Sequence, residues 1–288
     1  MKKIQLCLNL LFISVITPCY AKTLLPEHQF LQIQGHEIHL LSFDPDSVEI
    51  IQVKSPDNRR RSVTEFVKEH HAYAGINGGY FAISDNGEGS AVGALKIRGE
   101  WINFPIQKRG AIGWNKVEQK PYFDRLITKN RQTQPVVVPE FDTGPTARKR
   151  WQQFDYVVGG IPLLMKNSKP IVDYRQEQMI TSFSEERHAR TAVCLKKDGK
   201  WLWLVASHTK KPDRPQVSKI IEGLTLRELT DILLKQGCVD AINLDGGGSS
   251  TLVIDGKIIN QPAGDFNPLF RSYEERPVYD AMLLIPKG

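Results

Sequence analysis

The segment between residues 223 and 260 constrains the fold of this 288-residue chain more than any other. Thr225 and Glu228 have the spacing of a capping box, which marks the beginning of a helix, and Gly237 lies where that helix would end. The apolar positions between these signals repeat as one helical face: Leu226, Leu229, Ile232 and Leu233. An apolar strand follows, and Asp245 then precedes three consecutive glycines. The segment predicts a helix, a buried strand and a glycine-rich turn that carries one carboxylate at the strand's end.

A second segment repeats this scheme nearer the N-terminus. Ser62 and Glu65 have capping-box spacing, and Gly75 lies beyond the end of the predicted helix. The apolar strand that follows contains Asn77, immediately before Gly78-Gly79. Two such units predict related halves of one mixed sheet, with both glycine turns on the same side.

The rest of the chain predicts mostly strands. Residues 37–45 and 47–55 read as two strands, and Asp198-Gly199 and Asp255-Gly256 are dipeptides typical of hairpin turns. Apolar residues make up 41% of the chain and charged residues 24%, which is typical of a soluble globular protein. We therefore expect an α+β fold in a single domain, with mixed, largely antiparallel sheet or sheets, a few packed helices and two glycine-rich strand-end turns.

The N-terminus has the pattern of a secretory signal. Two lysines precede an apolar run over residues 4–16, and Ala21 is a small residue at a cleavage position. We expect a signal peptide over residues 1–21, a folded domain over 22–288, and an exported protein that is periplasmic or secreted. A lipoprotein anchor at Cys19 is the alternative. No later run approaches the ~20 apolar residues of a spanning helix, so the mature chain is expected to have no transmembrane segment.

Two cysteines, Cys194 and Cys238, remain after the predicted signal peptide. In an oxidising compartment they could form one disulfide, whereas buried free thiols would behave as small hydrophobic side chains. The sequence leaves both possibilities open, and it leaves the oligomeric state open as well.

The formal net charge is +6, and the basic residues gather in short clusters at 59–61, 148–150 and 210–211. None of these clusters is interleaved with aromatic residues. A solvated surface is therefore expected rather than a nucleic-acid-binding patch.

The two glycine turns are candidates for binding an anion. Consecutive glycines let the backbone approach a ligand closely, and successive N–H groups can form an anion-binding nest. The residues concerned are Gly78, Gly79, Gly246, Gly247, Gly248, Ser249 and Ser250. The turn after Asp245 is neither a phosphate-binding loop with Gly-Lys-Ser/Thr nor a Gly-x-Ser-x-Gly nucleophile elbow. A plain tight hairpin turn is the alternative.

A second group of candidate site residues stands before the apolar strand at residue 190. Arg187 and Arg190 are three residues apart, and an arginine fork suits bidentate recognition of phosphate or carboxylate. His188 lies between them and is a further candidate for substrate binding. Surface ion pairing is the alternative for the arginines, and a structural role is the alternative for the histidine.

The sequence predicts no metal site and no cofactor. The spacing of His, Cys and Asp matches no zinc site. Acidic loop residues such as Asp85 and Glu88 leave calcium as a weaker alternative.

At these residues the chain resembles the phosphodiester glycosidase family. The matching segments follow the family's order across roughly residues 40–285: "INGGYF" (76–81), "RGAIG" (109–113), "GGIPLL" (159–164), "RHARTAV" (187–193), residues 224–250 and "RPVYDAMLL" (276–284). The pair "NGGYF" and "NLDGGGSS" is specific, whereas either piece alone would be weak.

The resemblance implies a hydrolase that cleaves a sugar from a phosphodiester, with an active site lined by Asn77, Arg187, Arg190, Asp245 and the Gly246–Ser250 turn. A glycosyl phosphodiester requires a carboxylate at the sugar carbon and positive or N–H donors at the phosphate. Asp245 could supply the first, and the arginines with the glycine turns could supply the second. A phosphate leaves without much help from a proton, so one acid could be sufficient. A protein that only binds phosphosugars or polysaccharide, and an enzyme acting on another envelope glycan bond, remain alternatives.

Overall fold

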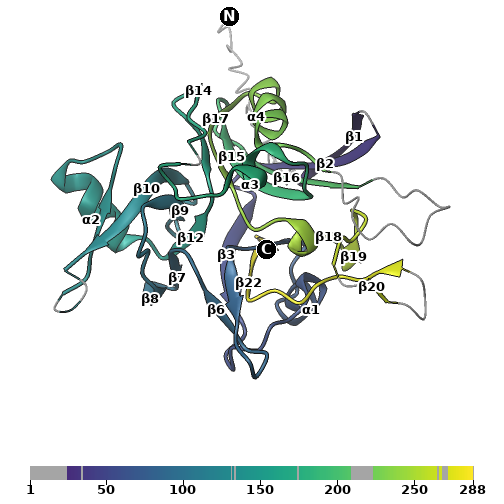
Figure 1. Cartoon of the computed structure of the whole chain (residues 1–288), viewed down its shortest axis with the longest axis horizontal. Coiled ribbons are helices and arrows are strands. Elements are labelled where there is room, and N and C mark those ends of the chain that lie inside the picture. The colour runs from purple at the N-terminus through teal and green to yellow at the C-terminus, as the bar shows by residue number, and fades with distance from the viewer. Residues whose placement is uncertain are drawn as a thin grey trace, which may run out of the picture.

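We describe a computed structural model of the chain, which places residues 25–287 except 34, 131, 133, 174, 209–222, 265 and 268–271. The predicted signal peptide and the basic pair at 210–211 lie outside these residues. Three main sheets surround one core, and every strand pairing found among the placed residues is antiparallel (Figure 1). The predicted α+β fold is confirmed.

The largest sheet has seven strands in the order β1 (Glu27–Ile33), β2 (His36–Phe43), β16 (Trp201–His208), β15 (Arg190–Lys196), β17 (Cys238–Asn243), β13 (Leu163–Lys166) and β14 (Lys169–Pro170). The predicted hairpin at Asp198-Gly199 joins β15 to β16, and Gly199 has the positive φ of +87° that such a turn requires. Cys194 and Cys238 lie on the adjacent strands β15 and β17 and form a disulfide with a Cα–Cα distance of 5.8 Å.

The second sheet has six strands in the order β11 (Val136–Pro139), β10 (Tyr122–Lys129), β9 (Arg109–Trp114), β12 (Tyr156–Gly160), β7 (Leu95–Ile97) and β8 (Glu100–Asn103). The third has five, in the order β19 (Lys257–Ile258), β18 (Leu252–Ile254), β4 (Ala74–Asn77), β22 (Asp280–Pro286) and β3 (Val48–Lys54). Two small hairpins complete the strands: β5 (Phe81–Ile83) with β6 (Gly89–Ala91), and β20 (Phe266–Asn267) with β21 (Ser272–Tyr273).

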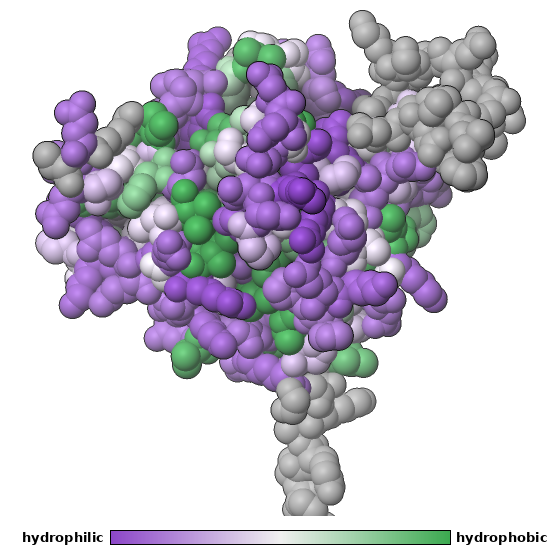
Figure 2. All heavy atoms as spheres, turned by 90° about the horizontal axis from the view of Figure 1, so that it is seen from below, coloured by the Kyte–Doolittle hydropathy of each residue, from purple (hydrophilic) through white to green (hydrophobic). Residues whose placement is uncertain are grey.

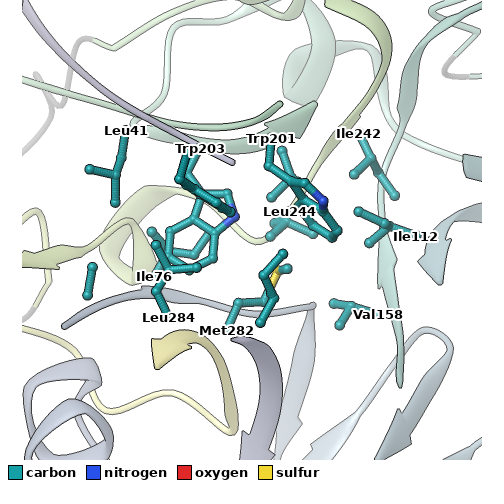
Figure 3. Close-up of a cluster of buried hydrophobic side chains, with 14 of the residues drawn as sticks. Leu41, Ile76, Ile112, Val158, Trp201, Trp203, Ile242, Leu244, Met282 and Leu284 are labelled. Atoms are coloured by element: carbon teal, nitrogen blue, oxygen red, sulfur yellow. The ribbon is translucent and has the colours of Figure 1, made fainter. Parts of the chain in front are cut away.

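The inner faces of the three sheets meet in a shared hydrophobic core (Figure 3). Trp203 from β16, Ile112 from β9 and Met282 from β22 are each fully buried there. Alternate residues of a strand point to opposite faces. The neighbours Leu202 and Leu283 therefore lie on the outer faces of their sheets, in separate clusters.

One helix covers the outer face of each main sheet (Figure 1). Helix α4 (Leu226–Lys235) packs on the seven-stranded sheet, α1 (Val63–Glu69) on the five-stranded sheet, and α2 (Pro145–Gln153) on the six-stranded sheet. A short helix, α3 (Thr181–Glu185), lies beside α4. None of the helices in the placed part of the chain is long and apolar enough to cross a membrane.

Both predicted capping boxes are present. The Ser62 hydroxyl accepts a hydrogen bond from the Glu65 N–H at 3.1 Å, and Thr225 accepts one from the Glu228 N–H at 3.2 Å. Gly237 follows the last turn of α4 with a φ of +79°, as expected for a helix stop.

Two finer expectations about the repeated scheme are wrong. Gly75 is not a helix stop: it lies inside β4, where an added Cβ would stand 2.6 Å from Val67 of α1, so glycine permits close packing of helix on strand. The two helix–strand–turn units are also not halves of one sheet, because β4 and β17 belong to different sheets. Their glycine turns nevertheless come together.

Candidate active site

The two glycine turns meet through the side chain of Asn77, at the end of β4. Its Nδ2 donates to the backbone oxygen of Asp245 at 2.8 Å, and its Oδ1 accepts from the Thr191 hydroxyl at 2.7 Å. The Asp245 N–H in turn donates to the Gly78 oxygen at 3.2 Å. Asn77 is fully buried, so this amide fixes one turn against the other rather than facing a ligand.

Asp245 stands at the end of β17 and lines a cavity of about 480 Å³. The other lining residues are Arg60, Phe81, Ile83, Ser249 and Arg276. Burial raises the pKa of Asp245 from 3.8 to about 6, although the Gly246 N–H, which donates at 2.9 Å, and the charge of Arg276 favour the ionised form. At neutral pH the cavity therefore contains a carboxylate that is poorly solvated.

A second carboxyl group, Asp280, was not among the sequence candidates. It begins β22, is 2% exposed, and accepts hydrogen bonds from the Gly79 N–H at 3.1 Å and from Gln52 Nε2 at 2.8 Å. Burial, followed by the negative charge of Asp245, raises the pKa of Asp280 to about 8. A signal was present in the sequence, since this aspartate directly precedes the apolar run of a buried strand.

Gly78 is needed because the Asp280 carboxylate lies where a side chain would be. A Cβ added at Gly78 would stand 2.6 Å from Asp280 Oδ1. The same principle applies in the other turn, where a Cβ at Gly248 would collide with the guanidinium of Arg276. The glycines therefore make room for the Asp280 carboxyl group and the Arg276 guanidinium.

The N–H groups of the turns are largely used within the protein. Gly78 and Gly79 donate to Asp280, Gly246 to its neighbour Asp245, Gly247 to the Ala189 oxygen, and Ser249 and Ser250 to the oxygens of Gly246 and Gly247. These six groups are not available for the anion-binding nest expected from the sequence. Positive charge at the cavity comes instead from Arg60 and Arg276.

Arg190 is fully buried at the beginning of β15, and its guanidinium holds surrounding backbone. Nε donates to the Leu224 oxygen at 2.9 Å, and one terminal nitrogen donates to the oxygens of Phe183 and Glu186 at 2.6 and 3.1 Å. Burial lowers the pKa of Arg190 to about 10, which leaves it charged at neutral pH. Arg190 thus secures the segment around α3 against β15.

Arg187 and His188 are placed beside this segment. The guanidinium of Arg187 bonds to Glu228, the capping residue of α4, and to His36 of β2 at 2.7 Å. The backbone of His188 pairs with Leu224, and its ring stacks on Phe183 with centroids 6.2 Å apart. Burial, and then the charge of Arg190, lowers the pKa of His188, so the ring is neutral at pH 7.

Tyr80 lies near these groups and near Asp245. In the sequence it stood out only as part of the segment "NGGYF". Its ring lies 5.9 Å from that of Phe183, and its hydroxyl accepts a hydrogen bond from Asn243 Nδ2 at 3.0 Å. Burial, and then the nearby charge of Asp245, raises the pKa of Tyr80 well above its usual value. A neutral phenol therefore stands within electrostatic reach of the carboxylate.

In the part of the chain that the structure places, no group of three or more His, Cys, Asp or Glu side chains is arranged to hold a metal ion. Asp85 and Glu88, the residues considered for calcium, are exposed in the loop between β5 and β6.

Fold and site together describe a class of protein. Asp245 lines one cavity with Arg60 and Arg276, and its charge acts on the buried Asp280, whose pKa is higher. A family model for phosphodiester glycosidases matches residues 70–285, well over half of the 288 residues. The chain belongs to the phosphodiester glycosidase family, and the resemblance noted in the sequence is confirmed.

Individual relatives are more distant. Human N-acetylglucosamine-1-phosphodiester alpha-N-acetylglucosaminidase is 51% identical over 41 residues, which are 14% of this chain and 8% of the human protein. The catalytic domain of the zebrafish enzyme of that name, auto-inhibited by its pro-peptide, superposes with a TM-score of 0.66 and 17% identity over 91% of this chain and 82% of that one. A hypothetical protein from Synechocystis superposes with the same TM-score and 16% identity, over 91% of this chain and 62% of its own. These superpositions establish a shared fold.

Proposed function

We propose that the protein hydrolyses glycosyl phosphodiesters, breaking the bond between sugar C1 and a phosphate oxygen. The observation that carries the proposal is the cavity in which Asp245 faces the same space as Arg60 and Arg276. Family membership supports this class of substrate, and the printed activity of the human and zebrafish relatives names a sugar-1-phosphodiester. An N-acetylglucosamine-like sugar is the first candidate.

In the proposed reaction, Asp245 stabilises the sugar carbon as it becomes positively charged. Asp245 acts either as the nucleophile or as the base that takes a proton from water; water supplies the new hydroxyl at C1, and the phosphate leaves with the electron pair of the broken bond. The leaving phosphomonoester is already a stable anion and needs little protonation. Arg276 and Arg60 balance its charge in a site from which water is partly excluded.

The proposed role of Asp280 is to remain neutral while Asp245 is ionised. Two adjacent carboxylates would repel each other, and burial makes a second charge costly. With its higher pKa, Asp280 retains its proton at pH 7 and keeps a single negative charge at the site. It thereby positions the Gly78–Gly79 turn without competing for the sugar cation.

The remaining predicted site residues are proposed to hold this constellation. Asn77 joins the two turns, and Arg190 secures the backbone around α3, whose Phe183 packs against Tyr80. Arg187 and His188 flank the same segment, where they are proposed to shape the rim of the sugar site. The chemistry uses only groups of the protein and calls for no cofactor.

We also propose that the protein is exported. The proposal depends on the signal pattern in the sequence, and the disulfide between Cys194 and Cys238 supports it because such bonds persist in oxidising compartments. N-terminal sequencing of the mature protein tests it: a chain that begins near residue 22 agrees, and a cytoplasmic chain that retains Met1 contradicts it.

The test of function is product analysis with the purified protein. N-acetylglucosamine α-1-(methyl phosphate) and UDP-N-acetylglucosamine are incubated with it; the free sugar is followed by proton NMR, and the released methyl phosphate or UDP by phosphorus NMR. Release of both products from either compound supports the proposal. Binding of these compounds without turnover would identify a phosphosugar-binding protein instead, and hydrolysis of uncharged glycosides alone would identify a glycosidase of another class.

A further inference from the structure

A second cavity of about 310 Å³ lies beside Tyr80 and is lined by Val92, Gly93, Pro105, Ile106, Gln107 and Arg109. None of these residues takes part in the mechanism proposed above. Arg109 opens the segment "RGAIG", which the sequence comparison singled out and the proposed chemistry leaves without a role.

The lining combines apolar surface with one cation. Val92 and Ile106 are 41% and 56% exposed, so the cavity presents apolar side chains to a ligand. Figure 2 shows several hydrophobic residues near the centre of a mainly hydrophilic face and others toward its edges. The Nε–H of Arg109 is buried and has no hydrogen-bond partner among the placed residues. A buried donor without a partner is destabilising, and an anionic ligand that accepts this N–H would remove that penalty.

The buried acid whose charge acts on Arg109 accepts no hydrogen bond from this Nε–H. Glu177 is fully buried and accepts hydrogen bonds from the Gly110 and Leu163 N–H groups at 2.8 and 2.9 Å and from Arg125 Nε at 2.8 Å. Glu177 therefore also serves Arg125, and the Nε–H of the cavity-lining Arg109 is left without an acceptor among the placed residues.

Tyr80 and Gly159 interact both with residues that line this cavity and with residues around Asp245. The Val92 N–H donates to the backbone oxygen of Tyr80 at 2.9 Å, and the charges of both Asp245 and Arg109 act on the Tyr80 hydroxyl. Gly159 packs against Gly79 on one side and Gly93 on the other. These shared neighbours are the structural link between the two cavities.

We propose that this cavity is the subsite for the alcohol that is esterified to the phosphate, and that it selects alcohols with an apolar segment followed by a second anionic group. The apolar segment lies on Val92 and Ile106, and the anionic group accepts the Arg109 Nε–H. The inference rests on the proposed function for its placement, but the ligand preference of the cavity follows from its own lining.

The test compares three N-acetylglucosamine α-1-phosphodiesters whose alcohols are methanol, hexanol and 6-phosphohexanol. We expect kcat/KM to rise in that order by at least tenfold overall. Arg109→Gln should reduce the preference for 6-phosphohexyl over hexyl at least tenfold, and Ile106→Ser should reduce the preference for hexyl over methyl. Lys108→Gln, a neighbouring cation that pairs with Glu140 outside the cavity lining, should keep both preferences.

A binding measurement separates failure of this inference from failure of the proposed function. Hexane-1,6-bisphosphate, the leaving product of the longest substrate, is titrated into wild type and Arg109→Gln by calorimetry. At least tenfold weaker binding to the variant supports the subsite even if no diester is hydrolysed, in which case the proposed function alone is wrong. Equal affinity for both proteins overturns the subsite, as does turnover that is indifferent to the alcohol.

Discussion

Replacing Asp280 by Asn should stabilise the folded protein at neutral pH. The folded pKa of Asp280, about 8, lies above the ordinary 3.8, so between these values the folded protein holds a proton that the unfolded chain has released. The contribution of Asp280 to the unfolding free energy is fully present below pH 3.8 and is lost as the pH rises toward 8. Asn is neutral at every pH and does not incur this loss.

The structure indicates that Asn can replace the carboxyl without breaking its contacts. Asp280 accepts from Gly79 and Gln52, whereas Asn has one acceptor and one donor. The Oε1 of Gln52 is buried and has no partner in the described part of the chain, so a flip of that amide would present an acceptor to the new Nδ2. About three pH units separate 3.8 from pH 7, and at 1.36 kcal/mol per unit the gain has a ceiling of about 4 kcal/mol.

The assay is urea unfolding of wild type and Asp280→Asn between pH 4.5 and 8, with the disulfide intact. The difference in unfolding free energy should grow with pH by up to about 1.4 kcal/mol per unit. Asp255→Asn is the control, because this exposed hairpin residue has a positive φ that Asn tolerates. A difference that stays constant from pH 5 to 8 would refute a raised pKa for Asp280.

Three further predictions concern activity. In the pH profile of kcat/KM, the rate should rise through the pKa of Asp245 near 6 and fall as Asp280 ionises near 8, and Asp280→Asn should abolish the fall; a basic limb that persists in this variant contradicts the assignment. Arg276→Ala should lower kcat/KM on a methyl phosphodiester by roughly two decades, about 3 kcal/mol, whereas the exposed Arg59→Ala should stay near wild type; equal effects would remove Arg276 from the phosphate site. Arg190 donates three hydrogen bonds to backbone carbonyls from two different nitrogens, and lysine, with one nitrogen, cannot reproduce them. Arg190→Lys should therefore lower both activity and unfolding free energy, the latter by roughly 2–4 kcal/mol in urea titrations. Wild-type stability of this variant would contradict the structural role of Arg190.

Local signals in the sequence predicted local structure well. Both capping boxes and the hairpins at Asp198-Gly199 and Asp255-Gly256 depend on residues within a few positions of one another, and all are present. The assignment of β4 and β17 to one sheet was wrong because strand order is set by long-range packing, which a single sequence does not encode locally.

The candidate site was predicted in part for the same reason. The two glycine turns were recognised, and the structure brings them together. Asp280 approaches Gly79 from 201 residues away along the chain, so its place beside Asp245 could not be inferred from spacing. For Arg190 the sequence was misleading in the opposite way. Its motif suggests that it binds a ligand, but its guanidinium donates to backbone carbonyls that only the fold places around it.

The most direct test of the account is the rate at which Asp245→Asn cleaves N-acetylglucosamine α-1-(methyl phosphate) under single-turnover conditions. Circular dichroism and thermal melting first establish that the variant is folded, and Asp255→Asn serves as the matched Asp-to-Asn control in an exposed turn. Loss of the negative charge at the sugar carbon should lower the rate by three decades or more, roughly 4 kcal/mol, with substrate binding retained. A folded Asp245→Asn protein that cleaves the diester at close to the wild-type rate would contradict the central claim and leave Asp245 with only a structural role in the turn.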